Sequence, residues 1–183
     1  MSHPIVVNVP VVVRPSAWVG CLACYNAGVL RGVWAYAEDA GAVTPEDIHE
    51  WETDHEELWC FDTEGLPCDV GEIPPSVAQE WGELFEEVGE PLWPALVAWF
   101  ESGSPSLDTH GLPSASEFED SYRGEWDSFE DFAWDYVENS GLLEGVPEEV
   151  ARYFDIDAYQ RDLRFDYTLM DVVGGSGVYV FAH

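Results

Sequence analysis

Apolar residues recur between Ser128 and Gly141 with the period of an α-helix. Ser128 is a suitable N-cap, and Gly141 can end the helix. One face collects the apolar positions i, i+3, i+4, i+7 and i+8: Phe129, Phe132, Ala133, Tyr136 and Val137. The opposite face carries Asp131, Asp135 and Glu138. Like charges at this spacing destabilise a helix by roughly 0.2–0.5 kcal/mol per pair, so an anchored helix with a face of one sign needs a functional explanation.

Two further helices are predicted within residues 69–113. The first follows Pro74-Pro75-Ser76 and has apolar positions at Val77, Trp81, Leu84, Phe85 and Val88. Its far side again carries acids: Glu80, Glu83, Glu86 and Glu87. The second, Pro91–Glu101, is apolar around most of its circumference, so we expect it to be buried. The segment from Ser102 to Pro113 is rich in Ser, Gly and Pro and is interpreted as a linker.

The N-terminal part predicts a small sheet with one helix. Ala17–Cys24 and Val29–Ala37 alternate as the strands of a hairpin, and Leu58–Asp62 is a third strand. Between them, Thr44 and Pro45 begin a helix as N-cap and first residue. Ile48, Trp51 and Leu58 fit one face of that helix. Its acids form a third exposed set: Glu46, Asp47, Glu50 and Glu57.

The C-terminal part predicts two short helices and a hairpin. Pro147 begins the first helix, and Asp155–Leu163 is the second. Tyr167–Val173 and Val178–Phe181 are strands joined by a glycine-rich turn. The expected fold is therefore α+β, in three small domains. We place an N-terminal arm at residues 1–16, an α+β domain at 17–68, a helical domain with its linker at 69–113, and an α+β domain ending in an antiparallel hairpin at 114–183.

The net charge of the chain indicates which class of partner it binds. The chain has 37 acidic residues against six arginines and no lysine, which gives a formal net charge of −31. Such a charge excludes direct binding to DNA or to an anionic membrane surface, and it favours cationic partners. A high aromatic content argues against disorder. No secretion signal or membrane span is recognised, so we expect a cytoplasmic protein.

No catalytic, metal or cofactor motif is convincing in the sequence. The cysteines, Cys21, Cys24, Cys60 and Cys68, have a spacing that invites a zinc site. However, Cys21 and Cys24 on one strand would diverge, so we expect buried free thiols and no metal. The histidines are scattered, and His49 and His55 lie six apart, off the helical i, i+4 spacing of a metal pair. We therefore expect no enzyme and no cofactor.

The geometry of charge then suggests what the acids do. Duplex DNA carries about one charge per ~1.7 Å of its axis, so 31 charges correspond to roughly 50 Å, or about 15 base pairs. An acidic face on rigid helices could copy the phosphates of a duplex. A protein groove built to hold nucleic acid is the natural partner.

Five blocks of the sequence also match known motifs. The first is Cys21-Leu22-Ala23-Cys24-Tyr25-Asn26-Ala27-Gly28-Val29-Leu30-Arg31-Gly32-Val33-Trp34. The others are Phe61-Asp62-x-Glu64, Val137-Glu138-x-x-Gly141, the segment from Val146-Pro147 through Tyr153-x-Asp155 to Arg161-Asp162-Leu163, and Gly177-Val178-Tyr179-Val180-Phe181. In this order, the five blocks resemble the ArdA antirestriction family. Residues 1–16 are extra, and Cys24, Thr63, Phe154 and Ile156 depart from the family pattern.

The resemblance implies an inhibitor encoded by a mobile genetic element and built as a DNA mimic. In the family, an elongated monomer pairs through its C-terminal domain into a homodimer. That dimer occupies the DNA-binding groove of a type I restriction–modification enzyme, at its methyltransferase core with the specificity subunit. It blocks restriction and often modification. The three acidic sets would then be the partner-binding residues.

Two other hypotheses stay open. The first is an acidic mimic or interaction module directed at another basic DNA-binding protein, or a chaperone for a basic protein. The second is a cation-binding or halophilic enzyme, since halophilic proteins are also acidic and poor in lysine. Competition with DNA for a type I methyltransferase separates the first from the family reading, whereas metal content and folding at low salt test the second.

Overall fold

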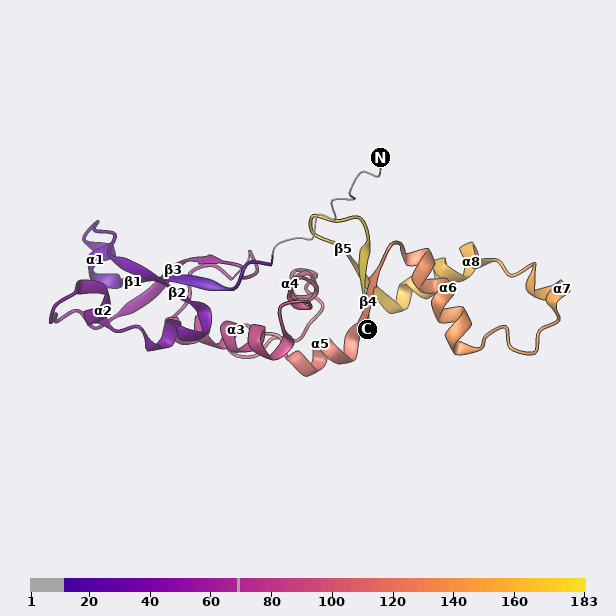
Figure 1. Cartoon of the computed structure of the whole chain (residues 1–183), viewed down its shortest axis with the longest axis horizontal. Helices are drawn as coiled ribbons and strands as arrows, with labels where there is room; N and C mark the ends of the chain where they lie inside the picture. Colours follow the sequence, from indigo (N-terminus) through magenta and orange to yellow (C-terminus); the bar gives the residue numbers. More distant parts are fainter. Residues whose placement is uncertain (1–11, 69) are drawn as a thin grey trace, which may run out of the picture.

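Two three-stranded antiparallel sheets lie apart along an elongated body, with helices between them and beyond the second sheet (Figure 1). The structure, a computed structural model, describes residues 12–68 and 70–183. Most of the predicted N-terminal arm, residues 1–16, lies outside these ranges. The mixed α+β class is confirmed, while the division into three domains stays a prediction. Among the described residues, no helix is long and apolar enough to cross a membrane.

The first sheet contains the predicted hairpin, whose first strand is the central strand of the sheet. Strand β1 (Ser16–Cys21) lies between β2 (Gly32–Tyr36) and β3 (Leu58–Glu64), antiparallel to both. The prediction that the first strand continues to Cys24 is wrong. Helix α1 (Leu22–Asn26) begins instead, because the Cys24 backbone N–H donates to Cys21 Sγ at 3.5 Å and makes Cys21 the N-cap.

Helix α2 (Pro45–His49) begins as predicted but is much shorter than predicted. Thr44 caps it in a capping box with Asp47, and Pro45 occupies the first position. The helix ends at Glu50, whose φ of 63° is left-handed and breaks the helical hydrogen bonding. Trp51 and Leu58 therefore do not share a helical face with Ile48. Before α2, a 3₁₀ segment, η1 (Ala37–Ala42), was not predicted.

The middle of the body is helical, as the periodicity predicts. Helix α3 (Pro75–Val88) buries its apolar face, and α4 (Trp93–Glu101) is largely buried. The Trp81 ring meets Trp93 and Phe100 edge-on, with centroids 6.3 and 5.2 Å apart. A further helix, α5 (Ala115–Ser121), precedes the second sheet and was not predicted.

The second sheet, β4 (Tyr122–Trp126), β5 (Tyr167–Asp171) and β6 (Val178–Ala182), has the order β4-β6-β5. The predicted β5–β6 hairpin is confirmed, whereas β4 was not predicted. Next to the sheet lie α6 (Phe129–Ser140) and α8 (Ile156–Leu163), followed by the 3₁₀ turn η2 (Arg164–Asp166). Helix α7 (Glu148–Ala151) lies at the far end (Figure 1). Ser128 and Gly141 cap α6 as predicted, but Tyr136 is exposed rather than buried.

Strand β6 joins two cores because its side chains alternate. Tyr179 and Phe181 belong to a core that runs back through α5, α4 and α3 to β1. Val180 faces the other way and packs with Phe132 of α6 and Leu163 of α8. Continuous burial therefore connects the first sheet, the helical middle and the second sheet.

Gly82 tests how tightly α3 packs on η1. A Cβ at this position would lie 2.1 Å from the backbone nitrogen of Glu38. Gly82→Ala therefore lowers the free energy of unfolding by about 1–3 kcal/mol through overpacking, although alanine is the better helix former by about 1 kcal/mol. Urea denaturation measures the difference. Glu87→Ala on the same helix is the control and changes stability little. A Gly82→Ala protein as stable as the parent would contradict the close packing.

Candidate functional site

In chain order, the first of the three predicted acidic sets lies on α2 and the loop after it. Glu46, Asp47, Glu50 and Glu57 are all exposed. Asp47 also stabilises the start of α2, because its Oδ2 accepts from the Thr44 backbone N–H at 2.9 Å and from Thr44 Oγ1 at 2.7 Å. These bonds hold the pKa of Asp47 below its ordinary value. Glu46, Glu50 and Glu57 have no such role in the described hydrogen bonds.

The second set lies on α3, opposite its buried face. Glu83, Glu86 and Glu87 are exposed and Glu80 is half-buried. Glu80 pairs with His110 Nδ1 at 2.8 Å, and Glu86 pairs with Arg14 at 2.9 Å. Glu83 accepts from Gln79 Nε2 at 2.8 Å, a neutral partner. This set therefore carries most of the charge neutralisation found among the predicted acids.

The third set lies on α6 and is exposed throughout. The Asp131 carboxylate accepts from Oγ of the N-cap residue Ser128 at 2.5 Å, and the Asp131 backbone N–H donates to the same Oγ at 3.2 Å. Asp135 and Glu138 make no ion pair with the described residues. Phe132, Ala133 and Val137 are buried on the opposite face, so packing fixes the direction in which these carboxylates project.

Few cations offset this charge. In the described ranges, the ion pairs involve Glu38 and Glu86 with Arg14, Glu80 with His110, and Glu148 with Arg152. Arg31 stacks on the Trp51 ring, 4.8 Å from its centroid. Arg123 donates to the backbone carbonyls of Asp120 and Tyr122. The arginines thus leave most carboxylates of this body without a cationic partner.

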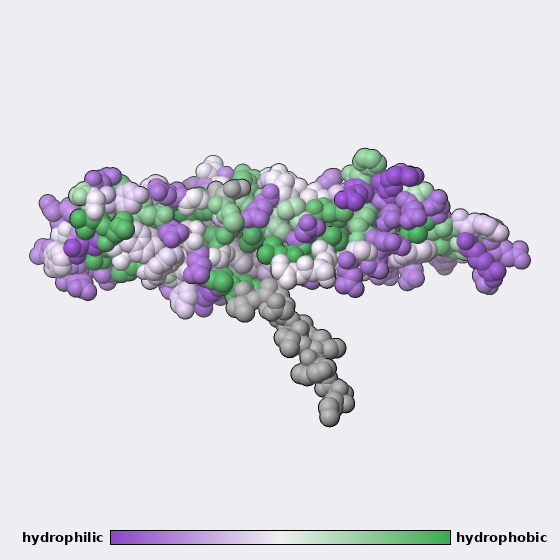
Figure 2. Space-filling model, turned by 90° about the horizontal axis from the view of Figure 1, so that it is seen from above, coloured by the Kyte–Doolittle hydropathy of each residue, from purple (hydrophilic) through white to green (hydrophobic). Residues whose placement is uncertain are grey.

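The three sets follow one another along the long axis of the body. Figure 1 shows α2 near one end, α3 in the first half and α6 in the second half. Figure 2 shows hydrophilic residues from one end of the visible face to the other, with apolar residues between them. The predicted acids are therefore spread along the body rather than gathered into one pocket, a distribution suited to an extended partner surface.

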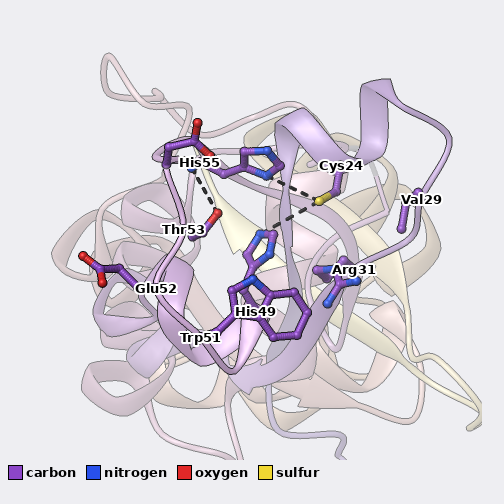
Figure 3. A pocket seen from close by; sticks show the side chains of 9 residues that line it. Cys24, Val29, Arg31, His49, Trp51, Glu52, Thr53 and His55 are labelled. Carbon is purple, nitrogen blue, oxygen red and sulfur yellow. Dashed lines mark hydrogen bonds between the residues drawn. The ribbon is translucent and has the colours of Figure 1, made fainter.

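A second constellation lies at the α1–α2 end and was missed by the sequence analysis. Cys21, Cys24, His49 and His55 place one sulfur or nitrogen atom each within 4.8 Å of all the others. Figure 3 shows the His49 and His55 rings directed toward Cys24 Sγ. Burial lowers the pKa of His49 and raises the pKa of Cys24.

This cluster was not predicted from the sequence because the end of β1 was placed too late in the chain. The expectation that Cys21 and Cys24 diverge is wrong, because Cys24 lies in the first turn of a helix that Cys21 caps. The Cys-x-x-Cys spacing was the available signal, together with the two histidines at 49 and 55. The other cysteines lie elsewhere: Cys60 is buried, with its pKa raised to about 12 by burial, and Cys68 is exposed rather than buried.

Comparison with known families supplies an independent observation. A family model described as Antirestriction protein (ArdA) matches residues 17–177. The match runs from the second residue of β1 through β5 and ends just before β6, and it confirms the resemblance drawn from the sequence blocks. No curated protein sequence matches the chain significantly.

The Glu80–His110 pair gives a pH-dependent prediction. Its hydrogen bond and charge raise the pKa of His110 above the ordinary value of about 6.5. The stability that the pair contributes is therefore fully present below the unfolded pKa and is lost as pH rises through the folded one.

Glu80→Gln should bring the pKa of His110 back down, and NMR titration of the imidazole ring measures it. Glu83→Gln on the same helix is the matched control and should leave the pKa of His110 unchanged. Equal His110 titration in the parent and in Glu80→Gln would show that the ion pair does not form in solution.

Proposed function

The chain belongs to the ArdA antirestriction family, and from this premise we propose that it inhibits type I restriction–modification enzymes by mimicking DNA. It would occupy the DNA-binding groove formed by the methyltransferase core and the specificity subunit. Restriction is then blocked, and modification with it, because both activities need the same groove. Members of the family are inhibitors rather than enzymes, so the proposal assigns contact residues and no catalytic ones.

One observation carries the proposal: exposed carboxylates of one sign on elements whose opposite face is buried. Asp135 and Glu138 project from α6 opposite Phe132 and Val137. The α3 acids likewise project opposite buried Trp81. Phosphate contacts supply much of the affinity of DNA-binding proteins, so anchored carboxylates can compete for the same cationic groove. An acidic disordered tail would instead lose conformational entropy on binding.

The elongated outline supports an extended contact. The helices that carry the acidic sets follow one another along the body (Figure 1). A protein that binds several turns of duplex DNA presents a groove of similar length. A homodimer formed through the C-terminal part would lengthen this surface. Exposed large hydrophobic residues there support such pairing: Val150, Tyr153 and Phe165 are 59%, 88% and 80% exposed.

The alternative partner is another basic DNA-binding protein, since carboxylates alone carry no base-specific information. Competition against labelled DNA distinguishes the two. Displacement of DNA from a type I methyltransferase at near-stoichiometric amounts supports the proposal. Equal displacement from unrelated repressors and nucleases favours the alternative.

Neutralisation of the acids should have a cumulative effect. Glu46→Gln, Glu87→Gln, Asp135→Asn and Glu138→Gln avoid the residues that cap helices or form ion pairs. Each single change should weaken inhibition by at most about fivefold, because an exposed charge contact contributes about 0.2–1 kcal/mol. The combined variant should lose inhibition while keeping its circular dichroism spectrum.

A matched control changes the same number of exposed positions without changing charge: Ser106→Thr, Thr109→Ser, Asn139→Gln and Ser176→Thr. This variant should inhibit as the parent does. If replacing one of the four acids by its amide abolished inhibition while the protein stayed folded, one essential residue and not an array would carry the function.

Binding should also weaken steeply with salt. Ions screen exposed charges over a Debye length of about 10 Å at 0.1 M, and a groove built for phosphates binds them with strong salt dependence. Isothermal titration against the methyltransferase at several salt concentrations gives the slope of log affinity against log salt. The combined variant should show a shallower slope. A flat dependence for the parent would contradict an electrostatic interface.

A further inference from the structure

Four metal-binding side chains converge at the α1–α2 end of the body, outside the acidic sets. They are Cys21, Cys24, His49 and His55, and their donor atoms lie within 4.8 Å of one another. We propose that these residues form a structural zinc site. This departs from the expectation, drawn from the sequence, that the chain holds no metal.

The separations match a zinc tetrahedron. Zinc binds sulfur at about 2.3 Å and nitrogen at about 2.0–2.1 Å, so tetrahedral geometry places sulfur and nitrogen ligands about 3.5 Å apart. Cys21 Sγ lies 3.2 Å from His55 Nδ1, and Cys24 Sγ lies 3.5 Å from the same nitrogen. Cys24 Sγ and His49 Nε2 are 3.9 Å apart. An ion between these atoms would draw the four donors together from their present span of 4.8 Å.

The donor types select the metal. Two sulfurs and two imidazole nitrogens in a tetrahedron favour zinc, whereas magnesium and calcium prefer oxygen ligands. Four protein ligands complete the coordination and leave no position for a substrate, which is typical of structural zinc. Binding releases the two thiol protons, and two thiolates balance the charge of Zn²⁺. The site therefore adds no net charge to this end of the body.

Local structure positions each ligand. The turn from β1 into α1 brings Cys21 and Cys24 together, and the Cys24 backbone N–H donates to Cys21 Sγ at 3.5 Å. Such N–H groups orient and stabilise a ligating sulfur. His49 is the last residue of α2, immediately before the left-handed Glu50. The His55 backbone N–H donates to Thr53 Oγ1 at 3.2 Å, a bond drawn in Figure 3.

Access and burial also fit a metal site. Cys21, Cys24 and His49 are buried, and His55 is half-buried. Cys24, His49 and His55 line a pocket of 660 Å³ together with Arg31 and neighbouring loop residues. The cluster is thus shielded from bulk water on one side and open to an entering ion on the other.

The metal would fasten an acidic loop to the sheet. Residues 50–57 connect α2 to β3 and carry five acids: Glu50, Glu52, Asp54, Glu56 and Glu57. His49 and His55 flank most of this loop, so coordination ties it to α1 at two points. Without metal, the loop is held by few described bonds, among them Leu22 N–H to the Glu57 carbonyl at 3.0 Å. The fixed loop keeps its mutually repelling carboxylates in place.

The direct test is the metal content of untagged protein purified without chelator. Inductively coupled plasma mass spectrometry should find one zinc per chain. Replacement by Co²⁺ should give the d–d absorption of a tetrahedral site and a thiolate-to-cobalt charge-transfer band. Chelation should lower the melting temperature by about 10 °C, the shift expected when a ligand at 1,000 times its dissociation constant is withdrawn from a chain of this size.

Two His55 variants separate loss of the ligand from loss of the fold. His55 is the least buried of the four residues, so His55→Ala should fold but lose most of its zinc on a weak chelating resin. His55→Cys supplies a different ligand and should retain zinc. Cys68→Ser and His183→Gln change residues outside the cluster and are the controls, both with one zinc per chain.

Hydrogen exchange reports the proposed role of the metal. Amides of residues 50–57 should exchange faster after chelation and in His55→Ala, while those of α3 keep their rates. The proposal is overturned if the parent protein neither contains zinc nor shows the thiolate–cobalt band, or if His55→Ala binds zinc as well as the parent. All these measurements use the isolated protein, so they do not depend on inhibition of a restriction enzyme.

Discussion

Mutual repulsion among 37 acidic side chains is the constraint on which the rest of this structure depends. A hydrophobic core rich in aromatic residues opposes it. Its ring contacts form two groups, Trp81 with Trp93 in the helical middle, and Trp99 with Phe118 and Phe181 at the second sheet. Each buried aromatic removes about 150–250 Å² from water. Because this core reaches from β1 to β6, the charges are carried by a connected body rather than by loosely joined segments.

The same acids divide into those that build helices and those that are free to meet a partner. At helix starts, the Asp47 carboxylate accepts from the backbone N–H of Thr44, and the Asp131 carboxylate accepts from the hydroxyl of the N-cap Ser128. A negative charge there also faces the positive end of the helix dipole. Glu80 and Glu86 pair with the few available cations. The remaining predicted acids of α3 and α6, among them Glu87, Asp135 and Glu138, project from faces that packing holds in place. This division explains how a strongly acidic chain keeps its helices while presenting charge outward.

At one end of the body, metal coordination by the Cys–His cluster would oppose the same repulsion between acidic side chains. The acidic loop after α2 follows His49 and contains His55, and all of its acids are exposed. Hydrophobic burial cannot fasten a loop made mainly of acids, but coordination can, because its strength comes from a few directed bonds. A neutral zinc–thiolate–imidazole group also leaves the surrounding negative surface unchanged.

The sequence by itself determined what depends on near neighbours. Ser128 and Gly141 bound α6, Thr44 and Pro45 begin α2, and the apolar spacing of α3 predicts its buried face. Charge composition predicted a cationic partner, and five ordered blocks indicated the family. Only the tertiary structure decided what depends on distant contacts. Strand β4 exists through pairing with β6, in which Tyr122 lies opposite Phe181, 59 positions later in the sequence. Likewise, one N–H···S bond ends β1 at Cys21, and the fold brings His55 beside it across 34 positions, which no local periodicity encodes.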